Sequence, residues 1–150
     1  MSERCPIING QKPNEEFDLD NESHLTALGF DPKGKQEKAD KYVHYPHCDW
    51  AVIEWKGSAI PKAIRQIEST IERLVEHGKK VDFAIVIKKR LNRYEQRTYK
   101  RRRDRVLIDP ETQDPYTVQA GSNRVNILLL YRSEVNSDNR LDKYLSGGSD

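Results

Sequence analysis

The sequence has few of the residues that stabilise secreted or membrane proteins. It contains only two cysteines, Cys5 and Cys48, which excludes a framework of several disulfides. No apolar run approaches the roughly 18 residues that a membrane-spanning helix requires. The N-terminal segment also lacks the apolar stretch of a secretory signal peptide. We therefore expect a cytoplasmic protein with no membrane partner.

Apolar residues are scarce for a chain of this length. Hydrophobic residues make up 35% of the 150 residues and charged residues 33%, which allows one modest core. Residues 1–20 are polar and without periodicity, so we expect a flexible N-terminal arm. The polar end of the chain predicts a disordered tail over residues 136–150. A single domain over residues 21–135 remains.

The charges are unevenly distributed along the chain. The net charge is only +2, but residues 88–105 hold 10 Lys and Arg against two acids, leaving 16 basic and 22 acidic residues elsewhere. A basic segment on an acidic body indicates an anionic polymer as partner, and we expect DNA. A solvated loop or an extended hairpin arm is the alternative. The residues expected to contact DNA phosphates are Lys88, Lys89, Arg90, Arg93, Arg97, Lys100, Arg101, Arg102, Arg103 and Arg105.

Two segments have the residue pattern of helices. Residues 58–78 repeat apolar side chains at helical spacing, with Ser58 as a possible N-cap and Gly78 as a stop signal. A shorter helix is expected over residues 21–30, where Asn21 can cap the N-terminus. The apolar stripe along residues 58–78 predicts that this longer helix packs on the core.

The remaining apolar segments have the composition of strands. Residues 81–87 are almost continuously apolar, which predicts a strand buried on both faces. Two aromatic and β-branched runs separated by a short polar turn predict a hairpin. The alternation of helices and strands predicts an α/β fold with one mixed central sheet flanked by helices. The expected strands are 40–45, 50–57, 81–87 and 124–135. Residues 105–119 are expected to form a strand, a turn region at Asp-Pro and a second short strand.

The run "WAVIEWKG" at residues 50–57 contains an acid and a base that an apolar strand does not need. Glu54 and Lys56 are two residues apart, so on a strand both side chains point to the same face. If the hairpin turn is centred on His47, the register pairs Tyr45 with Asp49, His44 with Trp50 and Asp40 with Glu54. The three charged side chains then converge.

Such a convergence of charges is suited to phosphodiester hydrolysis. Two carboxylates about 5 Å apart repel each other unless a cation lies between them. Oxygen ligands in pairs suit Mg²⁺, with Mn²⁺ able to substitute. The metal polarises a phosphoryl oxygen, and the lysine orients water or stabilises developing negative charge.

Two alternatives remain open for these residues. Asp40, Glu54 and Lys56 can instead form an exposed cross-strand charge cluster with no ligand. Asp49 competes with Asp40 as first acid, because Pro46 lies shortly before it. An uninterrupted strand places Asp49 on the face opposite Glu54, whereas a β-bulge reverses this.

The hairpin with Asp40 and Glu54-Trp55-Lys56, followed at once by a long amphipathic helix, resembles the PD-(D/E)XK nuclease superfamily. The resemblance covers roughly residues 21–131, and the chain is similar in size to archaeal Holliday junction resolvases and small endonucleases. It implies a restriction-endonuclease-like fold and a metal-dependent DNA endonuclease. A homodimer is also implied, because cutting two strands calls for two sites related by a two-fold axis.

The resemblance also implies roles for individual residues. The implied catalytic residues are Asp40, Glu54, Lys56 and Gln66. The implied metal ligands are Asp40, Glu54, the Trp55 carbonyl and, from the first helix, Glu22. The sequence departs from the family pattern because Ala39, not proline, precedes Asp40. Two other hypotheses therefore stand beside the nuclease: a non-catalytic nucleic-acid-binding module of the same fold, and a regulatory protein that binds an acidic protein partner.

Overall fold

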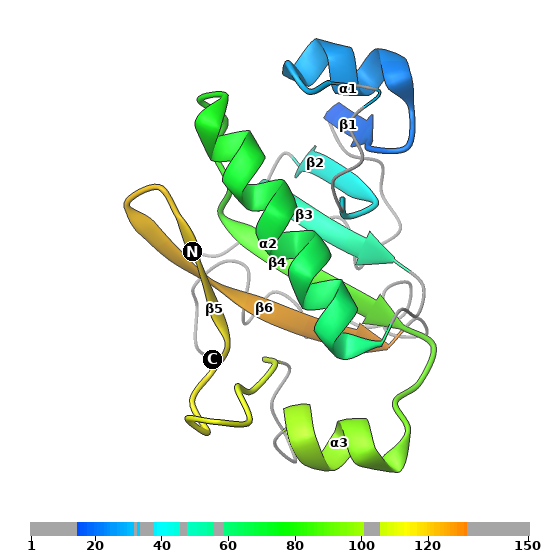
Figure 1. The fold of residues 1–150 in the computed structure, drawn as a ribbon, viewed down its shortest axis with the longest axis vertical. Coiled ribbons are helices and arrows are strands. Elements are labelled where there is room, and N and C mark those ends of the chain that lie inside the picture. Colours follow the sequence, from blue (N-terminus) through cyan, green and yellow to red (C-terminus); the bar gives the residue numbers. More distant parts are fainter. Residues whose placement is uncertain are drawn as a thin grey trace.

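The computed structural model describes residues 15–31, 33, 38–45, 48–55, 59–100 and 106–131. Within them the chain forms one six-stranded sheet and three helices, so the predicted mixed α/β class is confirmed (Figure 1). The elements in chain order are β1 (Glu15–Asp18), α1 (Glu22–Leu28), β2 (Lys41–Tyr45), β3 (Cys48–Trp55), α2 (Ile60–Glu76), β4 (Phe83–Lys88), α3 (Arg93–Tyr99), β5 (Thr117–Ala120) and β6 (Asn123–Tyr131).

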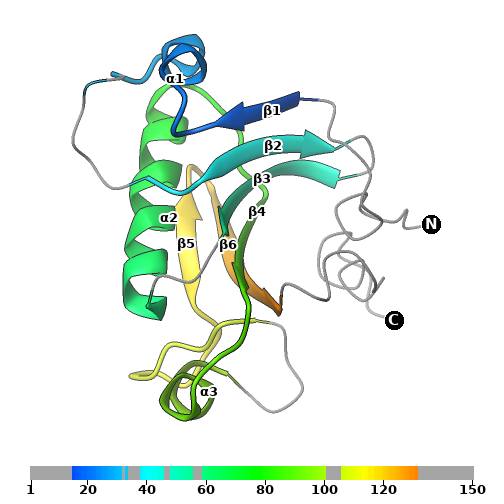
Figure 2. The ribbon, with the colours of Figure 1, turned by 90° about the vertical axis from the view of Figure 1, so that its right-hand side faces the viewer.

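The sheet has the strand order β1-β2-β3-β4-β6-β5. Strand β2 runs antiparallel to both of its neighbours, β1 and β3, and β5 runs antiparallel to β6. Strand β4 runs parallel to both β3 and β6. Helix α2 makes the crossover from β3 to β4 and covers one face of the sheet, while α1 and α3 lie at opposite ends (Figure 2). The predicted hairpin is confirmed as β2 and β3.

Helix α2 forms because its apolar side chains follow one stripe. Ile60, Ile67 and Leu74 are fully buried in the core between the helix and the sheet. The helix begins at Ile60 with Pro61 in its first turn, and its N-cap residue makes no side-chain cap hydrogen bond. The predicted cap, Ser58, lies outside the described residues. No helix in the described part of the chain is both long and apolar enough to cross a membrane.

Strand β4 is buried on both faces, as its continuous apolar sequence predicts. Ala84 and Val86 belong to the core beneath α2. Ile85 and Ile87 point to the opposite face and are also buried. This central position holds the neighbouring carboxyl end of β3 in place.

Residues 15–20 were expected to belong to a flexible arm, and this expectation was wrong. Residues 15–18 form β1 at the edge of the sheet, where Phe17 pairs with Tyr42. The Phe17 and Tyr42 rings stack with centroids 6.0 Å apart. The next residue, Leu19, is fully buried, and its main-chain N–H donates to the Asp40 carbonyl oxygen at 2.9 Å. Alternation of charged and apolar residues in "EEFDLD" is the pattern of such an edge strand.

The basic segment contains a helix that was not predicted. Helix α3 begins after Asn92, whose Oδ1 accepts the Glu95 main-chain N–H at 2.8 Å. The Glu95 carboxylate in turn accepts the Asn92 N–H at 3.2 Å. This reciprocal pair is a capping box, which the Asn-x-x-Glu spacing already indicates. The expected loop or hairpin arm is therefore replaced by a helix over Arg93–Tyr99.

Candidate active site

The hairpin brings Asp40 close to Glu54, because the charge and the main chain of Asp40 both act on the Glu54 carboxyl group. The last observed pair at this end of the hairpin is Lys41 with Ile53, and His44 pairs with Trp50. The Asp40 main-chain N–H also donates to the Ile53 carbonyl oxygen at 3.1 Å. Glu54 lies on the face of the sheet that α2 covers. Side chains two residues apart on a strand share a face, and Val52, two residues before Glu54, belongs to the core beneath α2.

Glu54 is a buried acid with an unsatisfied oxygen. The residue is 4% exposed, and its Oε1 atom has no hydrogen-bond partner among the described residues. Burial, followed by the negative charges of Asp40 and Asp20, raises the pKa of Glu54 to about 8. The charge of Lys62 and a hydrogen bond from the Asp40 main chain oppose this rise in pKa. A carboxyl group in this state has high affinity for a proton or a metal cation.

The third acid near Glu54 is Asp20, which sequence reasoning missed. Asp20 lies two residues after the end of β1 and raises the pKa of Glu54 by its negative charge. Glu22, the predicted acid of the first helix, is exposed in the first turn of α1 and has no such effect on Glu54. Acids are frequent throughout residues 15–22, so the sequence offers no signal that distinguishes Asp20 from its neighbours.

Gln66 lies in a turn of α2 that is anchored to the start of β2. Its side chain is half-buried, and its Oε1 atom, like that of Glu54, is buried without a hydrogen-bond partner among the described residues. The Gln66 carbonyl oxygen accepts the Thr70 hydroxyl at 2.7 Å. The Thr70 hydroxyl oxygen accepts the Ala39 N–H at 2.8 Å. Through Thr70, α2 thus fixes the residue next to Asp40.

The lysine of the predicted site cannot be placed, but a second lysine lies near it. Lys56 is outside the described residues. Lys62 is exposed in the first turn of α2, and its charge lowers the pKa of Glu54. Nothing in the sequence separates Lys62 from other exposed lysines, because its relevance depends on how α2 packs on the sheet. Trp55, whose carbonyl is a predicted ligand, pairs with Ile87 of β4 in the parallel ladder.

The register also decides between the two candidates for the first acid. Tyr45 pairs with Cys48 and not with Asp49, because the register shifts between His44 and Tyr45. Our expected pairing of Tyr45 with Asp49 was therefore wrong, and the bulge is the reason. Asp49 is five residues from Glu54 along β3, about 16 Å at the usual rise per residue. That separation is too large for one shared metal, so Asp40 is the acid that accompanies Glu54.

The oxygen atoms around Glu54 are of the kind that binds a hard divalent cation, but they are few. Asp40 and Glu54 offer carboxylate oxygens, and the unsatisfied Oε1 atoms of Glu54 and Gln66 are oxygen donors without a partner in the described part of the chain. However, no group of three or more His, Cys, Asp or Glu side chains within the described ranges is arranged to hold a metal ion. Two carboxylates with water and substrate oxygens are sufficient for Mg²⁺, which commonly keeps several waters.

The described basic residues form an exposed surface around α3. Lys89, Arg90, Arg93 and Arg97 are exposed, and Tyr94 beside them is 64% exposed. Lys100 is half-buried. The other predicted DNA-contacting residues lie outside the described part of the chain: Arg101, Arg102, Arg103 and Arg105. We call the exposed set Lys89, Arg90, Arg93, Tyr94 and Arg97 the α3 basic surface.

Lys88 does not belong to the α3 basic surface, contrary to the prediction. It is 7% exposed, and its Nζ donates to Glu95 Oε2 at 3.0 Å. Burial alone would raise the pKa of Glu95, but hydrogen bonds from Lys88, Asn92 and Ile60, with the Lys88 charge, lower it. Glu95 therefore joins β4, α3 and the first turn of α2. Lys88 is engaged in this structural contact and is not available to a phosphate.

Comparisons with known proteins give no match to this chain. No protein-family model matches it, and neither does any curated protein or solved structure. Its function is therefore inferred from its own residues and geometry.

Proposed function

We propose that the chain is a metal-dependent DNA endonuclease that hydrolyses phosphodiester bonds, with Mg²⁺ as cofactor and Mn²⁺ able to substitute. The observation that supports this most is Glu54, a buried carboxyl group with an unsatisfied oxygen beside Asp40 and Asp20. Burial of such a group without a partner is costly. A divalent cation between the carboxylates would relieve both the repulsion and the unsatisfied oxygen.

The arrangement of elements around the site supports a restriction-endonuclease-like fold as the finer description. A β2–β3 hairpin carries both acids, α2 follows directly, and β4 lies parallel to β3. This is the order that a PD-(D/E)XK nuclease would show. A homodimer with two sites and a cytoplasmic location belong to the same proposal.

The residues of the site have distinct roles in the proposed hydrolysis. Asp40 and Glu54, with the Trp55 carbonyl, would hold Mg²⁺, and Gln66 would accept a hydrogen bond from bound water. When bound, Mg²⁺ polarises a phosphoryl oxygen and lowers the pKa of a water. Because the pKa of Glu54 is about 8, the carboxyl group is mostly protonated at neutral pH, and a cation that binds there must displace the proton. Lys56, with Lys62 as a second positive charge, would stabilise the negative charge that develops at the phosphate.

The α3 basic surface would hold the DNA. Arg93 and Arg97 lie on one short helix and can contact successive phosphates. Tyr94 presents an exposed ring next to them, which suits stacking on a base. The buried Lys88–Glu95 pair fixes this helix to β4, and the hydrogen bond of Glu95 with the Ile60 main chain fixes it to the start of α2, the helix that carries Gln66.

A non-catalytic nucleic-acid-binding module of the same fold is the second candidate. It is favoured by the lack of a three-ligand metal group within the described residues. Ala39 in place of the family's proline also supports it. In this case the α3 basic surface binds DNA and Glu54 remains protonated.

Cleavage of supercoiled plasmid and of branched DNA tests the proposal. Each substrate is incubated with Mg²⁺, Mn²⁺ or EDTA and with the parent protein, Glu54→Ala, Lys56→Ala or Lys62→Ala. Asp20→Asn is compared with Glu22→Gln to identify the third acid. Gel shifts in EDTA measure DNA binding in parallel, and circular dichroism confirms that each variant is folded.

The two candidates predict different results. A nuclease cuts with either metal, and Glu54→Ala abolishes cutting but keeps the gel shift. Loss in Lys56→Ala, and not in Lys62→Ala, identifies the catalytic lysine. Salt-sensitive DNA binding without cutting under any metal would reject the nuclease and support the binding module.

A further inference from the structure

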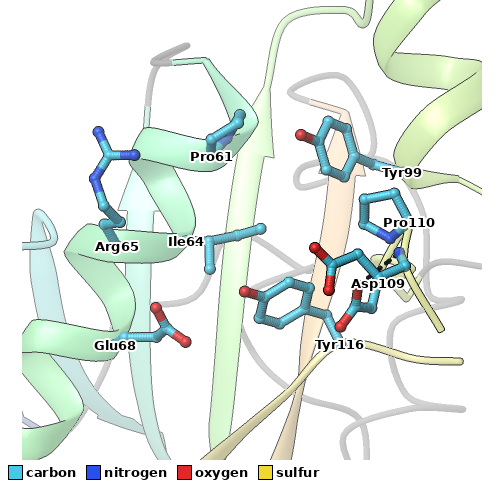
Figure 3. A pocket seen from close by; sticks show the side chains of 9 residues that line it. Pro61, Ile64, Arg65, Glu68, Tyr99, Asp109, Pro110 and Tyr116 are labelled. Atoms are coloured by element: carbon cyan, nitrogen blue, oxygen red, sulfur yellow. Dashed lines mark hydrogen bonds between the residues drawn. The ribbon is translucent and has the colours of Figure 1, made fainter.

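A pocket separate from the Glu54 site lies on the other flank of α2. Helix positions three or four apart share a flank, which places Pro61, Ile64 and Glu68 together and turns Gln66 away from them. Opposite this flank stand the end of α3 and residues 109–116 (Figure 3). The cavity encloses about 310 Å³, at the small end of the range for ligand pockets. We call it the tyrosine pocket; its lining residues are Pro61, Ile64, Arg65, Glu68, Tyr99, Asp109, Pro110, Glu111 and Tyr116.

The tyrosine pocket is lined by a largely buried tyrosine whose hydroxyl has no hydrogen-bond partner among the described residues. Tyr99 is 7% exposed as a residue, and its hydroxyl forms no hydrogen bond within the described part of the chain. Figure 3 shows this hydroxyl turned toward α2, into the space between the two walls. The Tyr116 hydroxyl points into the same space. The Asp109 carboxylate also lines the pocket, where its Oδ1 atom accepts the Glu111 main-chain N–H at 2.9 Å. Two tyrosine hydroxyls from one wall thus converge on a cavity of ligand size that an acid also lines.

The lining of the pocket contains more acidic than basic side chains. The lining contains three acids and one base, and the guanidinium of that base, Arg65, is turned away from Glu68 in Figure 3. Burial, and then the charges of Glu68 and Asp109 among others, raises the pKa of Tyr116. Burial also raises the pKa of Glu68. The field at the tyrosine hydroxyls therefore favours a positively charged ligand.

The separation of the acids decides which kind of cation fits. No three His, Cys, Asp or Glu side chains of the described residues are grouped closely enough to hold a metal ion, and this includes Glu68, Asp109 and Glu111. An organic cation with several N–H donors can reach acids that are spread apart. Pro61, Ile64 and Pro110 offer apolar contacts to an alkyl chain, and the tyrosine rings can face an ammonium group.

We propose that the tyrosine pocket binds a small organic polycation, an alkyl diamine or polyamine, with its amino groups on Glu68 and Asp109 and on the Tyr99 hydroxyl. This site is separate from the Glu54 site and does not depend on nuclease activity. Its occupant would also contact both α2 and the segment after α3, and so would hold these two elements together.

Isothermal titration with 1,4-diaminobutane and spermidine tests the proposal on the full chain. Butane-1,4-diol has the same carbon chain without charge and serves as the ligand control. Glu68→Gln and Asp109→Asn each remove one charge and keep the side-chain shape, and Asn retains the oxygen that accepts the Glu111 N–H at 2.9 Å. Glu72→Gln, on an exposed part of the same helix outside the pocket, is the matched control variant.

Saturable amine binding is expected, with no binding of the diol. Glu68→Gln and Asp109→Asn should each weaken it about tenfold or more, as for a lost hydrogen bond to a charged group. Tyr99→Phe keeps the ring, removes the hydroxyl and should also weaken binding, which keeps the test valid if an acid variant is misfolded. Absence of saturable binding overturns the proposal. So does equal weakening by Glu72→Gln and Glu68→Gln, which would indicate diffuse surface attraction.

Discussion

The hydroxyl of Thr70 connects α2 to the start of β2, because its oxygen accepts the Ala39 N–H at 2.8 Å. Thr70 is fully buried, so water cannot replace this contact. We expect Thr70→Val, which keeps the shape and removes the hydroxyl, to lower the free energy of unfolding by about 1–3 kcal/mol. Thr70→Ser retains the hydroxyl and should lose less. Urea denaturation of the three proteins measures the difference, and an equal loss in both variants would contradict this role.

The stability of the metal-free protein should depend on the protonation of Glu54. Its pKa is about 8 in the folded protein and near 4.5 when exposed, so the folded state binds the extra proton between these values. The free energy of unfolding should therefore be highest below pH 4.5, as far as Glu54 is concerned, and fall by a few kcal/mol as pH rises through 8.

Glu54→Gln mimics the protonated acid and should flatten this pH dependence. Urea denaturation at several pH values between about 5 and 9, in EDTA, compares it with the parent protein. Addition of Mg²⁺ should stabilise the parent protein most at high pH, where the carboxylate is free to bind it. A parent protein whose stability does not fall relative to Glu54→Gln across this range would show that Glu54 titrates normally.

The buried pair of Lys88 and Glu95 should be important for stability. Lys88→Met leaves the Glu95 carboxylate buried and without its cation, which should cost about 3–5 kcal/mol. Adding Glu95→Gln removes the stranded charge and should restore much of the loss. Lys89→Met changes the exposed neighbour and should alter stability by less than about 0.5 kcal/mol. Thermal denaturation compares the four proteins; similar melting of the two single variants would exclude a structural role for Lys88.

The α3 basic surface should determine how DNA binding responds to salt. Arg93→Gln and Arg97→Gln should each weaken binding and reduce the slope of log affinity against log salt by about 0.9 for each phosphate that the variant no longer neutralises. Lys79→Gln removes a charge beyond the other end of α2 and serves as control (Figure 1). Fluorescence anisotropy in EDTA over a range of salt concentrations gives the slopes. Identical slopes in all variants would place the DNA elsewhere.

Tyr94 tests whether the bound DNA includes unpaired bases. Tyr94→Ala should weaken binding of single-stranded DNA by about 1–3 kcal/mol and affect duplex DNA much less, because a paired base does not offer its face. Tyr94→Phe keeps the ring and should bind like the parent protein. Equal losses on single-stranded and duplex DNA would contradict stacking.

The hairpin could be predicted from the sequence because it is determined by local rules. Alternation places Glu54 on a defined face, and the pairing of Lys41 with Ile53 brings the preceding residue, Asp40, close to it. The bulge at His44 and Tyr45 was not predictable, because a single inserted residue leaves no trace in the apolar pattern. Helix α3 was predictable in principle from Asn92 and Glu95, but the density of basic residues obscured the capping box.

Other parts of the site depend on contacts between distant segments. Asp20 reaches Glu54 only because β1 joins the sheet beside β2. The charge of Lys62 acts on Glu54 only because α2 packs at one particular rotation, which the apolar stripe fixes approximately. In the sequence, Lys88 is indistinguishable from the other basic residues of segment 88–105. Only its burial against Glu95 in the folded protein shows that it has a structural role. The sequence therefore predicted the acids of one hairpin better than the groups that surround them.

The proximity of Asp40 and Glu54 has a consequence for how the protein folds. The two acids are 14 residues apart, whereas the paired residues Ala84 and Ile127 of the parallel sheet are 43 apart. Closing longer loops costs more entropy, so the hairpin should form before β4 and β6 pair. At that stage water still screens the two charges from each other. Their repulsion becomes large only when α2 docks, so uptake of a proton or a cation by Glu54 should accompany the docking of α2.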